Sequence, residues 1–380
     1  MQGTLIYPEW TPIEVARHYG LPEGLSGAGQ KIAVIDMGEV VDLAELAVDF
    51  EKLGLPMPDV QLIDLGGAAV PALGPSAIET HIDVEIIGSL CPGAQIFIYR
   101  CAFSFRAMAD TIARAVVDGV DVISISWGAR EDALASGDIA RIENALQDAK
   151  QAGVTVCVAS GDAGASGMTS PVTHAPIPDP AGGVHCIYPG SSPQVLSCGG
   201  TQIVEHEGVQ REVVWNNTAT GGRASGGGVS KQFHPPEWQK GMNIASQNRS
   251  GMPGRISPDV AAVAAVKSWK FFDRSGTQDL EGGTSAVAPL YASLIALANQ
   301  QRVANGQKRL GFLNDRLYAL AAKGGIFADI CEGNNAVAPN GKGYEAAQGY
   351  DACTGWGIPL IAPLLKALVD LKETQNSTQL

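Results

Sequence analysis

A serine follows two glycines at the start of a long apolar segment. Residues Gly282-Gly283-Thr284-Ser285 precede a stretch in which leucines recur at helical spacing, so Ser285 is expected in the first turn of a buried helix. That turn has backbone N–H groups without partners and lies at the positive end of the helix dipole. The position suits a nucleophile whose oxyanion needs hydrogen-bond donors, and it equally suits a serine that only caps the helix.

A serine nucleophile needs a base, and a helix predicted at residues 77–90 offers two kinds. Glu79 and Asp83 are four residues apart and therefore share one helix face. His81 lies about 200° around the helix from Glu79, so the carboxyl pair and the histidine cannot both face Ser285. Two adjacent carboxyl groups titrate at different pH, which lets one act as a base while the other shares its proton. A solvated acidic helix face is the alternative interpretation of the pair.

A third carboxyl group lies at the end of a predicted strand. Residues 154–160 form an apolar strand pattern, and Gly161-Asp162 follow it directly. Loops at the carboxyl ends of strands bind ligands in α/β sheets. A protonated aspartic acid there could donate a hydrogen bond to an oxyanion, whereas an aspartate that only shapes a turn is the structural alternative.

The rest of the chain indicates the elements that must hold these groups. Predicted strands alternate with predicted helices up to residue 160, which favours an α/β fold with a mostly parallel central sheet and helices on both faces. A long loop at 163–190, a β-hairpin at 202–215 and a glycine-rich stretch at 221–228 follow. No linker is evident, so residues 1–380 are predicted to form a single domain. The strands are predicted at 31–36, 60–65, 95–100, 121–126 and 154–160, and the helices at 12–19, 42–53, 77–90, 105–118, 138–152, 311–322 and 363–371.

Composition excludes some functions. The chain has 26 Lys and Arg against 39 Asp and Glu, a net charge of −13, and it has no basic run. Nucleic-acid binding is therefore not expected. Charged residues make up 17% of the chain, fewer than the roughly 25% of typical domains. Because few cations would repel one another once the carboxylates are neutralised, such a surface is tolerable in acid.

Cysteine spacing and hydropathy add two expectations. The seven cysteines show no metal-binding spacing. Cys157 lies in an apolar strand pattern and is predicted to be a core thiol, while Cys331 and Cys353 are predicted to form a disulfide. No transmembrane run and no signal peptide are present, so no membrane association is expected.

Taken together, the motifs resemble those of the sedolisin family, the serine-carboxyl peptidases, and especially its kumamolisin branch. Glu79-x-x-x-Asp83, Ser160-Gly161-Asp162 and Gly283-Thr284-Ser285-Ala286 occur in the family's order. Their joint order and spacing are specific. Further similarity lies at 7–22, 124–128, 226–230 and 257–260. The resemblance implies a subtilisin-like fold and a peptidase catalytic domain.

The resemblance also implies roles for these residues. Ser285 would be the nucleophile and Glu79 its general base. Asp83 would share the proton of Glu79, and protonated Asp162 would join the Ser285 N–H in the oxyanion hole, which requires acid. The supporting network and the substrate-binding residues would be Asp36, Ser126, Trp127, Gly128, Gly226 and Gly227. Relatives often carry glutamate where this chain has Asp36, and His81 is expected to be an exposed helix residue.

One calcium ion is implied in a C-terminal loop region at about 326–359. Its ligands would be the carboxylates of Asp329 and Asp351 and the carbonyl groups of Ile330, Ala347 and Gly349, since calcium prefers oxygen ligands. The family further implies polypeptide substrates, a prodomain encoded ahead of the catalytic domain, secretion into an acidic environment and a monomer.

Two competing hypotheses remain. A subtilisin-type peptidase would use Asp36, His81 and Ser285, although the His-Gly-Thr-His box of that family is absent and Asp162 replaces its asparagine. A catalytically inactive binding protein on the same scaffold is the other. The substrate preference is not indicated by the sequence.

Overall fold

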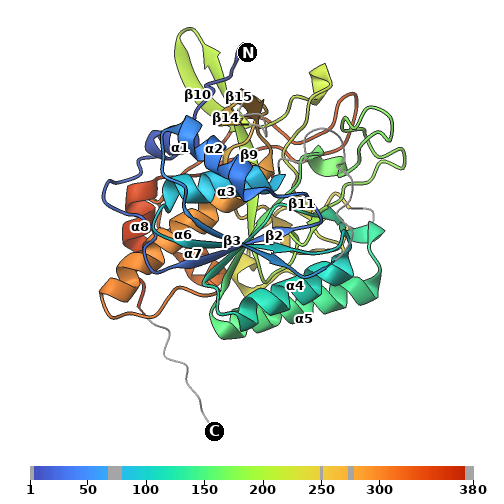
Figure 1. The fold of residues 1–380 in the computed structure, drawn as a ribbon. Helices are drawn as coiled ribbons and strands as arrows, with labels where there is room; N and C mark the ends of the chain where they lie inside the picture. Colours follow the sequence, from blue (N-terminus) through green and yellow to red (C-terminus); the bar gives the residue numbers. More distant parts are fainter. Residues whose placement is uncertain (1–3, 67–78, 249–250, 273–277, 373–380) are drawn as a thin grey trace.

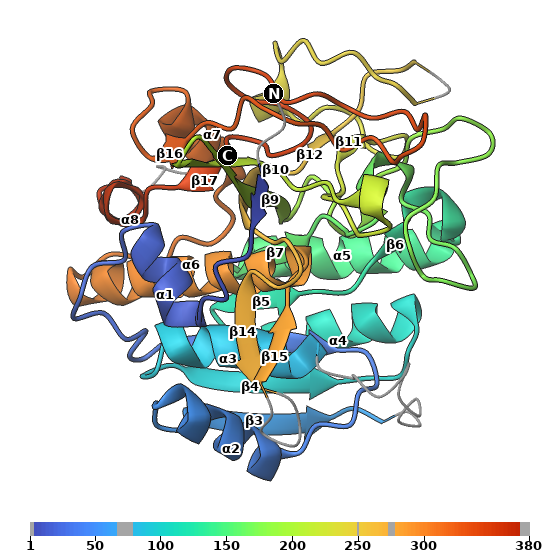
Figure 2. The same cartoon turned by 90° about the horizontal axis from the view of Figure 1, so that it is seen from above.

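A twisted sheet crosses the centre of the molecule and has helices on both faces (Figure 1). The computed structural model describes residues 4–66, 79–248, 251–272 and 278–372. In this part of the chain the sheet has nine strands, and six parallel ones run side by side. Figure 2 shows β3 and β4 at one side of this set and β7 and β9 toward the other. The predicted fold class is confirmed. The parallel strands are, in spatial order, β3 (Asp59–Asp64), β4 (Gln95–Arg100), β2 (Lys31–Asp36), β5 (Val122–Ile125), β7 (Thr155–Ala159) and β9 (Leu196–His206).

The long strand β9 organises the far edge of this sheet. It pairs in parallel with β13 (Val260–Val263) and antiparallel with β1 (Thr4–Ile6) and β10 (Val209–Val214). Strands β9 and β10 form the hairpin predicted at 202–215, with Val209 opposite His206.

Side chains of the central strands alternate between two cores. Ile32 and Val34 of β2 pack into one apolar cluster, and Ala33 and Ile35 pack into the other. Because successive residues of a strand point to opposite faces, the central strands β5 and β7 are buried along their whole length. Helices α4 (Phe105–Val117) and α5 (Ser136–Ala152) cover one face; the other is covered by α3 (Glu79–Leu90) and α6 (Val287–Ala304), with α1 (Pro12–His18), α2 (Leu43–Leu53) and α8 (Ile361–Val369) around them.

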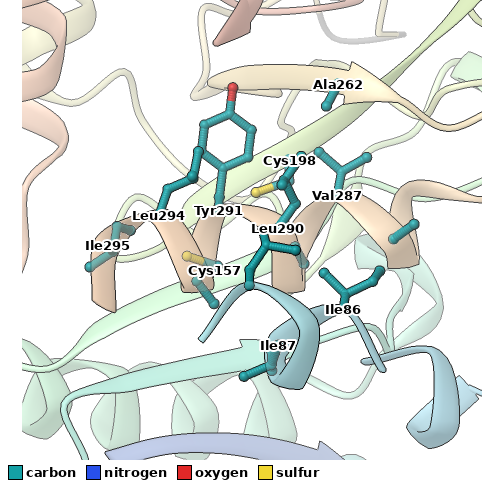
Figure 3. Packing of buried hydrophobic residues seen from close by; sticks show 14 of the residues in the cluster. Ile86, Ile87, Cys157, Cys198, Ala262, Val287, Leu290, Tyr291, Leu294 and Ile295 are labelled. Atoms are coloured by element: carbon teal, nitrogen blue, oxygen red, sulfur yellow. The ribbon is translucent and has the colours of Figure 1, made fainter. Parts of the chain in front are cut away.

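Helix α6 is enclosed on all sides over most of its length. Figure 3 shows Leu290 and Leu294 of α6 beside Ile87 of α3 and the thiols of Cys157 and Cys198. All residues from Val287 to Asn299 are buried, which is typical of a helix that is apolar on all sides. The burial predicted from the leucine spacing is confirmed, and it fixes the segment that carries Ser285.

Shorter elements complete the described chain. Helix α7 (Asn314–Ala321) lies where a helix was predicted at 311–322, and α8 corresponds to the one predicted at 363–371. The predicted start of the helix at 77–90 lies outside the described residues. Four two-stranded sheets are formed by β6 (Ala129–Arg130) with β8 (Ile187–Tyr188), β11 (Gly228–Val229) with β12 (Ile256–Ser257), β14 (Trp269–Phe272) with β15 (Gln278–Glu281), and β16 (Phe327–Ala328) with β17 (Ile358–Pro359).

The cysteine predictions have mixed outcomes. Cys157 is fully buried, as predicted. The predicted disulfide is wrong, because all seven thiols are free. Cys353 is buried and its thiol donates to the Tyr344 carbonyl at 2.9 Å, whereas Cys331 is exposed and contacts Asp329.

A buried ion pair ties β9 to the segments that follow it. Arg255 and Asp259 are both fully buried, with 2.6 Å between the Arg255 Nη2 and Asp259 Oδ2 atoms. Asp259 also accepts hydrogen bonds from the Ser197 backbone N–H and the Tyr318 hydroxyl. Several donors thus replace the water that the carboxylate loses on burial.

Replacing Asp259 by asparagine should destabilise the protein by about 3–5 kcal/mol, because Arg255 would keep a buried charge without its partner. Denaturant unfolding at constant pH measures this. The matched control is Glu332→Gln in the exposed pair with Arg211, which should cost about 1 kcal/mol or less. Equal losses in the two variants would contradict the prediction.

Candidate active site

A cleft of about 600 Å³ lies where β5 and β7 end and α3 and α6 begin. Both strands are parallel members of the central sheet, and such ends are where open α/β sheets bind ligands. Glu79, Asp162 and Ser285 line this one cleft together, although they are far apart in the sequence. The other lining residues are Ser126, Trp127, Gly128, Ala129, Arg130, Ala133, Ala159, Gly161, Ala163, Gly167, Thr169, His174, Ile187, Arg223 and Thr284.

Ser285 lies in a short 3₁₀ turn, Thr284–Ala286, that leads directly into α6. The turn needs glycine before it, because Gly283 has a φ of 119° and an added Cβ would lie 2.7 Å from the Asp162 Oδ2 atom. The Ser285 side of the turn opens to the cleft while only 8% of the residue is exposed. The backbone therefore presents one hydroxyl to the cleft from an otherwise buried segment.

Glu79 and Asp83 occupy successive turns at the start of α3. Glu79 is half-buried at the cleft, and Asp83 is fully buried beneath it. The Ser126 hydroxyl donates to Asp83 Oδ1 at 2.8 Å and lies 3.3 Å from the Ser285 carbonyl oxygen. Ser126 thus connects the buried carboxyl group to the nucleophile turn.

Burial dominates the electrostatics of this pair. It raises the pKa of Glu79, and a hydrogen bond with the Ser285 hydroxyl opposes that rise. Burial also raises the pKa of Asp83 well above its ordinary value, and the charge on Glu79 adds to the effect. A pair of this kind favours a form in which a single proton is held between the two groups.

Asp162 is held against the same turn from the opposite side of the cleft. Its Oδ1 atom accepts from the Thr284 backbone N–H at 2.9 Å and from the Thr284 hydroxyl at 2.8 Å. Its Oδ2 atom lies 3.5 Å from Arg223 Nη1. The Thr284 hydroxyl also accepts from the Gly161 N–H at 3.0 Å, a link between the two segments that the sequence analysis did not anticipate.

Comparison with known proteins identifies the family of the chain. Residues 69–310 match the model of the Subtilase family. The chain belongs to the subtilase family.

Within this family, the chain is a kumamolisin-like sedolisin catalytic domain. It is 39% identical over 369 residues to kumamolisin from Bacillus sp. (strain MN-32), covering 95% of this chain and 64% of the relative. It is 32% identical over 262 residues to human tripeptidyl-peptidase 1, covering 66% of this chain and 43% of the relative. The structure of Pseudomonas sedolisin, a serine-carboxyl proteinase in complex with pseudo-iodotyrostatin, has a TM-score of 0.80 at 26% identity and covers 96% of this chain and 98% of that one.

The sedolisin domain departs from the expected carboxylate network at Asp36. Asp36 is fully buried, and its Oδ1 atom accepts from the Glu39 backbone N–H at 2.9 Å. The Glu39 carboxylate accepts in turn from the Thr80 N–H at 2.8 Å and so caps the first turn of α3 beside Glu79. Glu39 was missed from the sequence, where only its position after Gly38 at the end of a strand could have indicated it.

His81 is not exposed, contrary to expectation. It is 1% exposed, and its Nδ1 atom lies 3.0 Å from Asp49 Oδ2 of α2. Asp49 and Ser285 lie on different sides of α3, in agreement with the helical geometry that separated His81 from Glu79. The histidine therefore joins two helices and is absent from the cleft lining.

The expected substrate-binding residues fall into two groups. Ser126, Trp127 and Gly128 line the cleft. Gly226 and Gly227 lie behind it, where an added Cβ would approach the carbonyl oxygens of Ser160 and Ala352 at 2.2 and 2.4 Å. Those glycines allow backbone segments to pack closely.

The residues expected to hold calcium lie together in one loop. Asp329 accepts from the Gly349 N–H at 2.7 Å, and Asp351 accepts from the Ala347 N–H at 3.1 Å. The side chain of Ile330, whose carbonyl group is the expected ligand, is buried in the adjoining apolar cluster. Carboxylate oxygens are the kind of ligand that a hard cation takes. No cluster of three or more His, Cys, Asp or Glu side chains occurs in the described residues.

Asp36 should make the stability of the protein depend on pH. Burial raises its pKa from the ordinary 3.8 to about 7, so its contribution is full below about pH 4 and is lost as the pH rises through about 7. An asparagine side chain at this position would mimic the protonated form. In Asp36→Asn, the fall in the free energy of unfolding between these pH values should shrink by up to about 4 kcal/mol.

Denaturant unfolding across this pH range measures the effect. Asp148→Asn, on the exposed side of α5, is the matched control and should leave the pH dependence as it is. If the free energy of unfolding of the wild type and of Asp36→Asn varied with pH in the same way, the raised pKa of Asp36 would be refuted.

Proposed function

We propose that this protein is an acid-active serine-carboxyl endopeptidase that cleaves unfolded proteins and peptides through an acyl-enzyme. The observation that carries the proposal is the meeting of Ser285, the buried Glu79 and Asp83 pair, and Asp162 at one cleft. The human relative is a peptidase by name, and Pseudomonas sedolisin is a serine-carboxyl proteinase. The chain spans 64% or less of the lengths of kumamolisin and the human relative. Synthesis with a prodomain and action in an acidic extracellular environment are further predictions from the family.

The proposed reaction begins with attack of the Ser285 hydroxyl oxygen on the peptide carbonyl carbon. The hydroxyl proton passes to Glu79, which Ser285 already contacts. The oxyanion that forms accepts from the Ser285 N–H and from protonated Asp162. Glu79 then returns the proton to the leaving amine as the C–N bond breaks, and water cleaves the resulting ester by the same steps.

Acid dependence follows from two requirements of this scheme. Asp162 must carry a proton to donate, and its Oδ1 atom already accepts two hydrogen bonds, so Oδ2 is the atom suited to hold it. Asp83, the more deeply buried partner, would keep the shared proton while Ser285 stabilises the ionised form of Glu79. The scheme therefore predicts an optimum in acid, because an ionised Asp162 would repel the oxyanion instead of donating to it.

The position of His81 argues against a subtilisin-type triad. Its ring contacts Asp49, so Asp36 and Ser285 have no histidine between them in the described structure. Glu79→Gln should therefore lower kcat by about 10²–10⁴-fold, whereas His81→Ala should keep its kcat per folded molecule and lose thermal stability.

A pH–rate profile on a denatured protein substrate, with Ser285→Ala as the inactive reference, measures both variants. The profile of the wild type should peak in acid. Full activity of Glu79→Gln or an alkaline optimum would contradict the proposal, and no cleavage at any acidic pH with calcium present would favour a binding protein on this scaffold.

We further propose that the loop holding Asp329 and Asp351 binds one calcium ion, together with the carbonyl groups of Ile330, Ala347 and Gly349. The support is the convergence of the two carboxylates on one loop. The ion would stabilise the loop and take no part in the reaction.

Chelation should lower the melting temperature, because a ligand bound only to the folded state stabilises it. Differential scanning calorimetry before and after a chelator, with calcium and then magnesium added back, measures the shift. Asp351→Asn should already have the lower melting temperature that the wild type reaches after chelation, and the chelator should change it little. If the chelator left the melting temperature of the wild type unchanged, a calcium ion that stabilises this loop would be excluded.

A further inference from the structure

A second hollow of about 480 Å³ adjoins the catalytic cleft, and nothing in the proposed reaction uses it. The two spaces share His174 and Arg223 as common wall residues. We call it the basic pocket and define it by its lining: Tyr7, Thr173, His174, Ala175, Asn217, Thr220, Gly221, Gly222, Arg223, Val266 and Lys267.

The charge of the basic pocket is opposite to that of the protein. Its lining contains Arg223, Lys267 and His174 and no carboxylate, on a chain whose net charge is −13. Arg223 and Lys267 carry positive charges, and His174 adds an imidazole ring to the same wall. A protonated Asp162 would also leave Arg223, now 3.5 Å from it, without a negative partner.

The backbone of two of these residues is strained. His174 and Lys267 have φ angles of 55° and 72°, and they are two of five such non-glycine residues in the described chain. A left-handed conformation costs a residue with a side chain about 1–2 kcal/mol, and such conformations gather at functional sites. The backbone of Arg223 is held by hydrogen bonds: its carbonyl group accepts from the Asn217 N–H at 2.9 Å, and the next N–H donates to the Asp162 carbonyl group at 3.0 Å.

The location of the pocket assigns it to one side of the scissile bond. Ser126, Trp127 and Gly128 line the catalytic cleft but not the basic pocket. They resemble the strand that flanks the substrate, and Ile187 fills the space beside Gly128, so this part of the cleft would take the acyl part of the substrate. The basic pocket adjoins the cleft at Arg223, the partner of Asp162, and would therefore lie toward the leaving amine.

We propose that the basic pocket binds a carboxylate of the polypeptide substrate on the leaving-group side. The carboxylate would belong either to an acidic side chain or to the chain terminus. This inference rests on the proposed function, because it names which substrates the same active site prefers.

Matched peptides test the preference. Each pair differs at one of the first three residues after the scissile bond, with glutamate or glutamine there, and a cysteic acid version supplies an anion that stays ionised in acid. A further pair ends in a free carboxylate or an amide shortly after the bond. The anionic member should have a kcat/KM roughly fivefold higher, as a partly exposed ion pair provides, and high salt should reduce the ratio.

Lys267→Asn should bring this ratio close to one, since asparagine is neutral and tolerates a positive φ. Lys323→Asn removes the same charge from an exposed turn after α7 and should leave the ratio unchanged. A preference confined to the internal glutamate pairs would identify the side chain as the ligand, and one confined to the free terminus would identify the terminal carboxylate.

Failure of the inference and failure of the proposed function give different results. Two results would overturn the proposed role of the basic pocket and leave the proposed function intact. One is cleavage of the neutral peptides without any preference for the anionic ones, and the other is a preference that persists in Lys267→Asn. Absence of cleavage of every peptide would overturn the proposed function. In that case the dissociation constants of the same peptide pairs for Ser285→Ala still test the pocket, with tighter binding of the anionic member expected and equal binding contradicting it.

Discussion

The burial of carboxyl groups at the start of α3 is the constraint on which the rest of the site depends. Asp83 lies in the interior between α3 and α6, and only one of its oxygens has a hydrogen-bond partner within the described structure. A carboxylate without enough donors is expensive to bury, so the protonated form is favoured. Asp36 shows the same effect. The packing that positions Glu79 against Ser285 therefore also makes the folded state one that suits acid.

Much of this arrangement could be predicted because it follows from local pattern. The apolar strands, the alternating helices and the helix that begins at Ser285 depend on periodicity over short stretches. The separation of Glu79 from His81 required only helical geometry. Each of these features is determined by residues close together in the sequence. They were enough to predict the elements that carry the catalytic candidates.

Features that depend on distant partners could not be predicted. His81 is buried because α2 supplies Asp49, 32 residues earlier, and no periodicity in α3 indicates such a partner. Glu39 caps α3 across a gap of 41 residues. The disulfide prediction failed for a related reason, because two cysteines in one irregular region need not approach each other, and Cys353 turns into a small apolar cluster while Cys331 faces solvent.

The long sequence separations within the site have a consequence for how the chain folds. Asp162 reaches Thr284 across 122 residues, and Ser126 reaches the Ser285 turn across 159. Contacts of this range form late, since they require most of the intervening chain to be ordered first. A partly folded molecule would thus hold a serine but no assembled machinery around it. Newly made chains would be spared attack by one another's unfinished copies until the sheet is complete.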